Sequence, residues 1–323
     1  MTFTIRVDEG AALYFRQDWI SVEGAAMFSL KNTSDLTRLQ LPSMSSWLLI
    51  FALALVSIPA AAAPNVGDSY TVIRESKSED SSTEGSSGSS FDRDTIIVRV
   101  ISASVGGFEL EYDLPPSASK QDRQVAWQFP ARVFMPLTGA PQLLNRAELS
   151  KRVDGWLARA GWTREVCGQW IFTWNAFKIE CDPQSVVGIV EAFNLQPPDL
   201  RDGASYKHPG ASQAMPLHKS SGAEGGSNYS VSMPIDAEQV RRDLAQTDIV
   251  VAKISGKILT EDAASAAHAA TQVCGTIAVT FEADATGTVK KRTVVTKLKL
   301  IEPSGKIETR KSTETLTRTL LKT

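Results

Sequence analysis

The chain has 323 residues, of which 42% are hydrophobic, and its formal charge is −2 at neutral pH. This length supports one large or two small domains with a substantial core, and the composition excludes a disordered chain or one dominated by membrane spans. A charge so close to zero also excludes the net basic domain that nucleic-acid binding requires.

An export signal is predicted near the N-terminus, within residues 1–62. The apolar run Trp47–Ile58 carries no charge and precedes Pro59 and four alanines, which is the pattern of a secretory h-region and its cleavage site. The run is shorter than the roughly 20 apolar residues needed to cross a bilayer. We therefore expect a bacterial-type signal cleaved near Ala62, a periplasmic or secreted mature chain, and no transmembrane anchor in it.

Three methionines are candidate start residues for this signal. A start at Met1 places a long segment of mixed polarity before the apolar run, and a start at Met44 leaves no positive charge there. Met27 gives a compact n-region with Lys31 and Arg38, so we expect translation to begin at Met27.

Residues 64–195 are expected to form a strand-rich part with two helices. Alternating apolar side chains predict four strands, over residues 68–75, 94–103, 107–114 and 125–134. The Ser- and Gly-rich stretch 76–90 is expected to be a mobile loop. Helices are predicted after Asn145 and after Asp182, where a capping residue precedes apolar positions at helical spacing.

A disulfide is predicted between Cys167 and Cys181. The segment between them is symmetric about Trp174, so a hairpin with its tip there places the two cysteines opposite each other. In an oxidising compartment we expect them to bond, leaving Cys274 as a free, buried thiol. The alternative is a partly helical segment with two buried thiols.

The remaining chain divides into a Pro/Gly/Ser-rich stretch and a regular C-terminal part. Residues 196–228 are expected to be a flexible linker or long loop. Residues 229–323 are predicted to form a helix after Asp236, a strand over 248–258, an alanine-rich helix over 263–273, and a three-stranded meander.

These elements indicate an α+β fold. We expect one curved antiparallel sheet of six to eight strands, taken from both ends of the mature chain and packed on about four helices. This arrangement is similar, in architecture only, to periplasmic carriers of lipids and lipoproteins. The alternative is two domains divided within residues 196–228.

The two ends of the mature chain differ in charge. From Gly287 onward ten Lys/Arg residues stand against three Asp/Glu, whereas acidic residues outnumber basic ones over 64–114. We expect the two ends to pair across neighbouring strands. The alternative is a basic surface for an anionic lipid or polysaccharide.

No residue pattern predicts a metal, a cofactor or a catalytic site. His208 and His218 lie in the expected linker at a spacing that metal sites do not use, and His268 lies in the alanine-rich helix. Three carboxylates alternate along one predicted strand, which indicates a solvated face more than an acid/base pair. They are Glu109, Glu111 and Asp113.

Aromatic residues are concentrated in the middle of the chain. Five of the seven tryptophans lie there, and Trp156 falls on an apolar helical stripe typical of a core. The other residues are candidates for an aromatic contact site for a lipid, a sugar or an apolar peptide. These candidate binding residues are Trp127, Trp162, Trp170, Trp174 and Phe172.

The sequence thus favours an exported, non-enzymatic binding or envelope-maintenance protein with an apolar, aromatic contact site. One alternative is a hydrolase with dispersed catalytic residues, built on His268 or on the Glu109–Asp113 strand. Another is a structural envelope component that contacts other proteins through an exposed edge of the C-terminal meander.

Overall fold

A computed structural model provides the structure of the protein and describes residues 64–172, 176–195 and 199–321. The predicted extension, signal, cleavage site and start residues lie outside these ranges, as does Trp174. Within the described ranges, no helix combines the length and the apolar character needed to cross a membrane.

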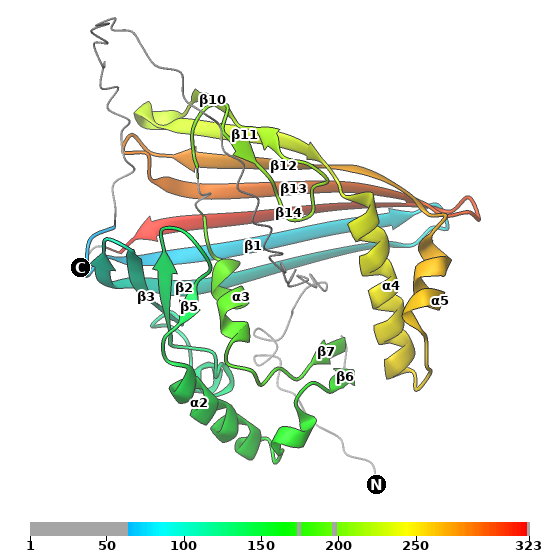
Figure 1. The fold of residues 1–323 in the computed structure, drawn as a ribbon, viewed down its shortest axis with the longest axis horizontal. Coiled ribbons are helices and arrows are strands. Elements are labelled where there is room, and N and C mark those ends of the chain that lie inside the picture. Colours follow the sequence, from blue (N-terminus) through cyan, green and yellow to red (C-terminus); the bar gives the residue numbers. More distant parts are fainter. Residues whose placement is uncertain (1–63, 173–175, 196–198, 322–323) are drawn as a thin grey trace, which may run out of the picture.

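The fold is α+β, and ten strands form one large antiparallel sheet (Figure 1). In spatial order these are β10 (His218–Ser221), β11 (Ser227–Pro234), β12 (Gln272–Ala283), β13 (Val289–Ile301), β14 (Ile307–Leu320), β1 (Ser69–Ser82), β2 (Ser87–Ser104), β3 (Gly107–Asp113), β4 (Ala131–Pro136) and β5 (Gln142–Leu143). The sheet is therefore larger than the six to eight strands predicted. It does not close on itself, because β10 and β5 form its two edges.

Strands from the two ends of the described chain meet at the centre of this sheet. β1 pairs with β14 over thirteen residue pairs, from Tyr70 opposite Leu320 to Ser82 opposite Glu308, and with β2 on its other side. The prediction that both ends build one sheet is confirmed. The stretch 76–90, expected to be a mobile loop, instead completes β1, turns, and begins β2. Its polar side chains suit strands whose backbones are paired while their side chains meet solvent.

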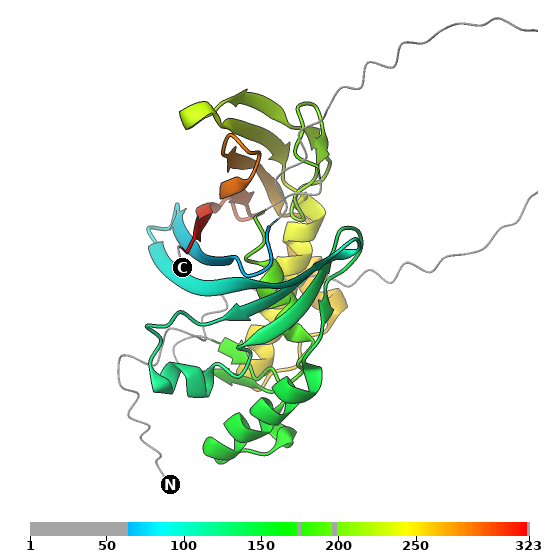
Figure 2. The ribbon, with the colours of Figure 1, turned by 90° about the vertical axis from the view of Figure 1, so that its left-hand side faces the viewer.

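Five helices occur among the described residues: α1 (Lys120–Val125), α2 (Arg146–Arg159), α3 (Ser185–Glu191), α4 (Ala237–Ile254) and α5 (Glu261–His268). Figures 1 and 2 show α3 and α4 on one face of the sheet, which bends around them. We call this the inner face and the opposite one the outer face.

The predicted strand over 248–258 is wrong, because α4 continues through most of it. Asp236 begins this helix by accepting a hydrogen bond from the Gln239 amide at 3.0 Å. The short apolar run Ile249–Val251 fits a strand or a buried helix equally well. Continuation of an already capped helix adds one hydrogen bond per residue, which favours the helix here.

The hydrophobic core lies on the inner face. Alternate residues of the central strands are almost fully buried there, among them Val72, Phe281 and Leu316. Their neighbours on the outer face, such as Thr315, are polar and partly exposed. The same core cluster includes Leu149 of α2, so the helices and the sheet share one core.

The segment expected to be a linker is packed onto this core. Beyond residues 196–198, which lie outside the described ranges, it contains two short paired strands, β8 (Ser205–Tyr206) and β9 (Met215–Pro216). Ala211 and Leu217 are fully buried. The segment has few apolar residues, but Ala211 and Leu217 lie in the core. The low average apolar content of the segment did not indicate that it packs on the core.

Substitution of Leu316 by alanine should test whether both chain ends share this core. Leu316 is 0% exposed on β14, so L316A should cost about 2–5 kcal/mol of unfolding free energy in urea. The matched variant T315A, on the outer face of the same strand, should cost about 0.5 kcal/mol or less. Equal costs for the two variants would contradict the proposed core.

Candidate functional site

A small disulfide-bonded hairpin stands apart from the main sheet. Its strands are β6 (Trp170–Phe172) and β7 (Ala176–Lys178), and Ile171 lies opposite Phe177. The predicted disulfide between Cys167 and Cys181 is present, with the two Cα atoms 5.6 Å apart. We call residues 167–172 and 176–181 the cystine hairpin.

The two faces of the cystine hairpin differ in their surroundings. Ile171, Ile179 and the two cysteines pack on the hydrophobic core. Trp170, which pairs with the exposed Lys178, is half-buried and is not among the residues that pack on this core. Because successive side chains of a strand point to opposite faces, Trp170 lies on the hairpin face that is turned away from the core.

The other candidate aromatic residues are divided between the core and the surface. Trp127 is only 2% exposed and belongs to the core. Trp162 is 36% exposed and meets the buried Trp156 edge to face, with ring centroids 5.9 Å apart. The side chain of Phe172 lies outside the described part. The structure therefore leaves Trp162 and Trp170 as the accessible candidates, and their binding role stays a prediction.

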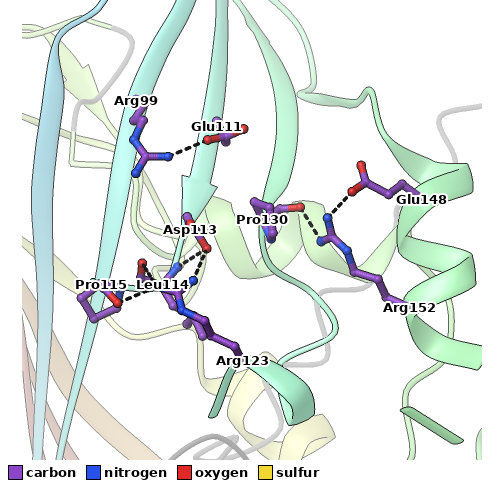
Figure 3. Close-up of polar contacts among 9 residues, drawn as sticks. All are labelled: Arg99, Glu111, Asp113, Leu114, Pro115, Arg123, Pro130, Glu148 and Arg152. Carbon is purple, nitrogen blue, oxygen red and sulfur yellow. Dashed lines mark hydrogen bonds and ion pairs between the residues drawn. The ribbon is translucent and has the colours of Figure 1, made fainter. Parts of the chain in front are cut away.

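The three alternating carboxylates of β3 each meet an arginine. Arg99 donates to Glu111 at 2.8 Å, Arg123 lies 3.2 Å from Asp113 (Figure 3), and Glu109 pairs with Arg132. Arg123 also donates to the carbonyls of Leu114 and Pro115 at 3.3 and 2.8 Å. Such ion pairs are typical of a stabilised sheet surface. They do not provide the two opposed carboxylates that acid/base hydrolysis needs.

Helix α2 is also fixed by an arginine. Arg152 donates to the Pro130 carbonyl at 2.8 Å and pairs with Glu148 one turn earlier in the helix (Figure 3). The contact connects α2 to the chain just before β4. Asn145 precedes this helix, but its side chain contacts Glu148 and the Arg132 amide and forms no cap on the helix.

His268 forms a contact between two helices. Its Nε2 atom lies 2.8 Å from Asp248 Oδ2, which joins α5 to α4. Within the described residues no serine completes a Ser/His/Asp arrangement with this pair. The side chains that the hydrolase alternative required are therefore engaged in pairwise contacts between structural elements.

A cluster of charged residues lies on the inner face beside the core. Glu314 of β14 accepts from Arg74 of β1 at 2.8 Å and from Arg292 of β13 at 3.0 Å. Arg292 also donates to the Asn194 carbonyl, after α3, at 2.7 Å. Asp94 of β2 lies 4.0 Å from Arg74, and burial raises the pKa of its carboxyl in spite of that charge. We call these four side chains the inner charge cluster.

His208, which lies in the segment expected to be a linker, borders the inner charge cluster and is partly buried. Its Nδ1 atom accepts a hydrogen bond from the Gly210 amide at 3.1 Å, which leaves Nε2 as the protonated nitrogen of the neutral ring. Burial and the charge of Arg292 lower the pKa of His208, against a smaller opposing effect of Glu314. The inner charge cluster therefore has two basic and two acidic side chains, with the neutral imidazole of His208 beside it, which suits a structural contact that holds these segments together.

The described residues contain no group of three or more side chains suited to hold a metal ion. An open cavity of about 720 Å³ lies beside the disulfide, between it and α2. Its arginines already have partners, since Arg164 lies 2.7 Å from Asp154 and Arg146 lies 3.6 Å from Asp182. No tryptophan lines this cavity.

Lowering the pH should destabilise the fold through His208. The pKa of its imidazole lies below the ordinary 6.5, so the unfolded chain takes up the proton first as the pH falls below 6.5. The contribution of neutral His208 to the free energy of unfolding is complete above pH 6.5 and is lost as the pH falls toward the folded-state pKa. The decrease in Tm between pH 7.5 and 5.5 should be smaller in H208Q than in the wild type. H218Q, at an exposed site on β10, should behave like the wild type; an unchanged decrease in H208Q would contradict this account.

No family model matches the chain, and no curated protein matches it. A solved structure titled "Lipid-protein interactions in lipovitellin" is similar, with a TM-score of 0.35 and 10% identity, over 79% of this chain and 25% of that chain. This chain thus spans about a quarter of that structure's length. A TM-score this low carries no argument about fold or function.

Proposed function

We propose that this protein is an exported, non-enzymatic binding protein with an envelope-maintenance role, and that it contacts an apolar partner through the outward face of the cystine hairpin. The observation that supports this proposal is the position of Trp170, which is held on the rigid hairpin but turned away from the core.

The proposed compartment agrees with the cysteine chemistry. The Cys167–Cys181 disulfide is compatible with an extracellular or periplasmic location. The export signal itself is proposed from the apolar run Trp47–Ile58 and the alanines that follow it. Together they favour a protein that works outside the cytoplasm.

The cystine hairpin suits a contact role because it is held in place before binding. Its disulfide closes a loop with a sequence separation of 14, which contributes about 3 kcal/mol when the entropy of the unfolded chain is counted. A rigid aromatic side chain loses little conformational entropy on binding and buries a large apolar area.

The alternatives have less support in the structure. The hydrolase would need His268 or the β3 carboxylates, which are paired with Asp248 and with arginines. The structural component would need a free edge on the C-terminal meander. That edge is absent in the described chain, because β12 pairs with β11 and β14 pairs with β1.

Substitution of Trp170 should weaken the proposed contact. Calorimetric titration with sodium oleate and with an apolar peptide should reveal which class of partner binds. W170A should weaken that binding about tenfold, the effect of losing about 1.4 kcal/mol of aromatic contact, and W170F should retain most of it.

F91A is the matched control, because Phe91 is a 60% exposed aromatic residue on β2. It should bind like the wild type, and the urea midpoint of W170A should stay close to that of the wild type. The proposal is wrong if neither probe binds, or if F91A weakens binding as much as W170A does.

A further inference from the structure

We propose that a groove on the outer face of the sheet binds an extended acidic polysaccharide. The groove has a volume of about 520 Å³ and crosses β12, β13, β14 and β1 near one end of these strands. It does not involve the cystine hairpin, so this inference is independent of the function proposed above.

The strand register places the groove on the outer face. Most of its lining residues form two rows across the four strands: Thr276, Lys297, Lys311 and Glu79 in one, and Cys274, Lys299, Thr309 and Ser81 in the other. Within each strand these positions alternate with the buried inner-face residues, such as Ile277 and Leu316. The two rows are two residues apart along each strand, or about 7 Å, and the backbone between them forms the floor.

Three lysines in these rows lack an acidic partner. Lys297, Lys299 and Lys311 are exposed, and none forms an ion pair with any described residue. Lysines at the other end of β13 are paired, Lys290 with Asp284 at 3.0 Å and Lys291 with Glu282 at 2.9 Å. Among the lysines of β1, β13 and β14, therefore, those outside the groove have an acidic partner and those in it do not.

The one carboxylate in the two rows is already engaged. Glu79 lies opposite Lys311 in the register but binds Lys77 at 2.6 Å. Its pKa is lowered first by the hydrogen bond and charge of Lys77 and then by the more distant Lys311. The two rows together carry three positive charges and one negative charge.

The positive charges of these lysines repel one another in the free protein. Lys297 and Lys311 are direct cross-strand partners, and like charges at such positions destabilise a sheet. A bound anion would remove this repulsion, so the groove is electrostatically complementary to a negatively charged chain. The acidic N-terminal strands thus neutralise the basic C-terminal strands only in part. The unpaired lysines form a basic surface, which is the alternative that the charge asymmetry of the sequence left open.

The shape and the other side chains of the groove favour a polysaccharide over a bilayer. Hydroxyl groups of Thr276, Thr309 and Ser81 accompany the lysines and can exchange hydrogen bonds with sugar hydroxyls. No aromatic residue lines the groove, and its single leucine, Leu298, alternates toward the inner face. A membrane-surface site would use apolar side chains that enter the acyl boundary.

The experiment is a calorimetric titration of the full chain with sodium alginate, a linear polyuronate, at 150 mM salt. The wild type should bind alginate but not neutral dextran. K297Q/K299Q/K311Q should weaken binding at least tenfold. The matched variant K290Q/K291Q/K306Q loses the same charge from lysines that have acidic partners, and it should weaken binding less than twofold because salt screens charges beyond about 8 Å.

Alkylation of Cys274 locates the bound polymer. Cys274 is free as predicted, but the prediction that it is buried is wrong, because it lies on the outer face of β12 and is exposed. It lines the groove, so saturating alginate should slow its reaction with iodoacetamide several-fold. The proposal is overturned if alginate does not bind, if the matched variant weakens binding equally, or if Cys274 is not protected. Preferential binding to phosphatidylglycerol vesicles, lost in K297Q/K299Q/K311Q, would also overturn it in favour of a membrane. W170A should keep full alginate affinity.

Discussion

The pairing of β1 with β14 is the constraint on which the rest of the structure depends. It joins strands more than two hundred residues apart in the sequence and makes one sheet of two hairpin systems that would otherwise each have an exposed edge. The bond between Arg74 and Glu314 crosses this pair, and Arg292 extends it to the chain after α3. The segments that contain the helices lie between the two joined ends in the sequence, and α3 and α4 cover the inner face.

Much of the fold was predictable where local pattern and turn chemistry agreed. The C-terminal meander and the disulfide of the cystine hairpin are examples, since alternation and symmetry in short segments determine both. Prediction failed where tertiary pairing decides the structure. The polar stretch 76–90 is extended because β14 lies beside it, and residues 248–254 are helical because a capped helix continues through an ambiguous apolar run.

The candidate sites likewise divide into features that local sequence pattern indicates and features that depend on tertiary pairing. Alternation within the hairpin separates Trp170 from the face of the two cysteines, and Trp170 is not among the residues that pack on the core with them. Nothing in the sequence distinguished Trp127 as a core residue. The inner charge cluster and the lysine groove each combine residues from strands distant in sequence, so only the register could reveal them. Both proposed contacts use side chains that the core does not require, and the sheet holds them in position.

Native-state hydrogen exchange tests most directly the claim that one sheet joins both ends of the chain. The amides of β1 that bond to β14, and those of β2 and β13, should exchange through the same global unfolding, with equal free energies as denaturant rises. A separate opening of β12–β14, at a lower free energy than that of β2 and β3, would contradict the account. It would mean that the two ends form independent units.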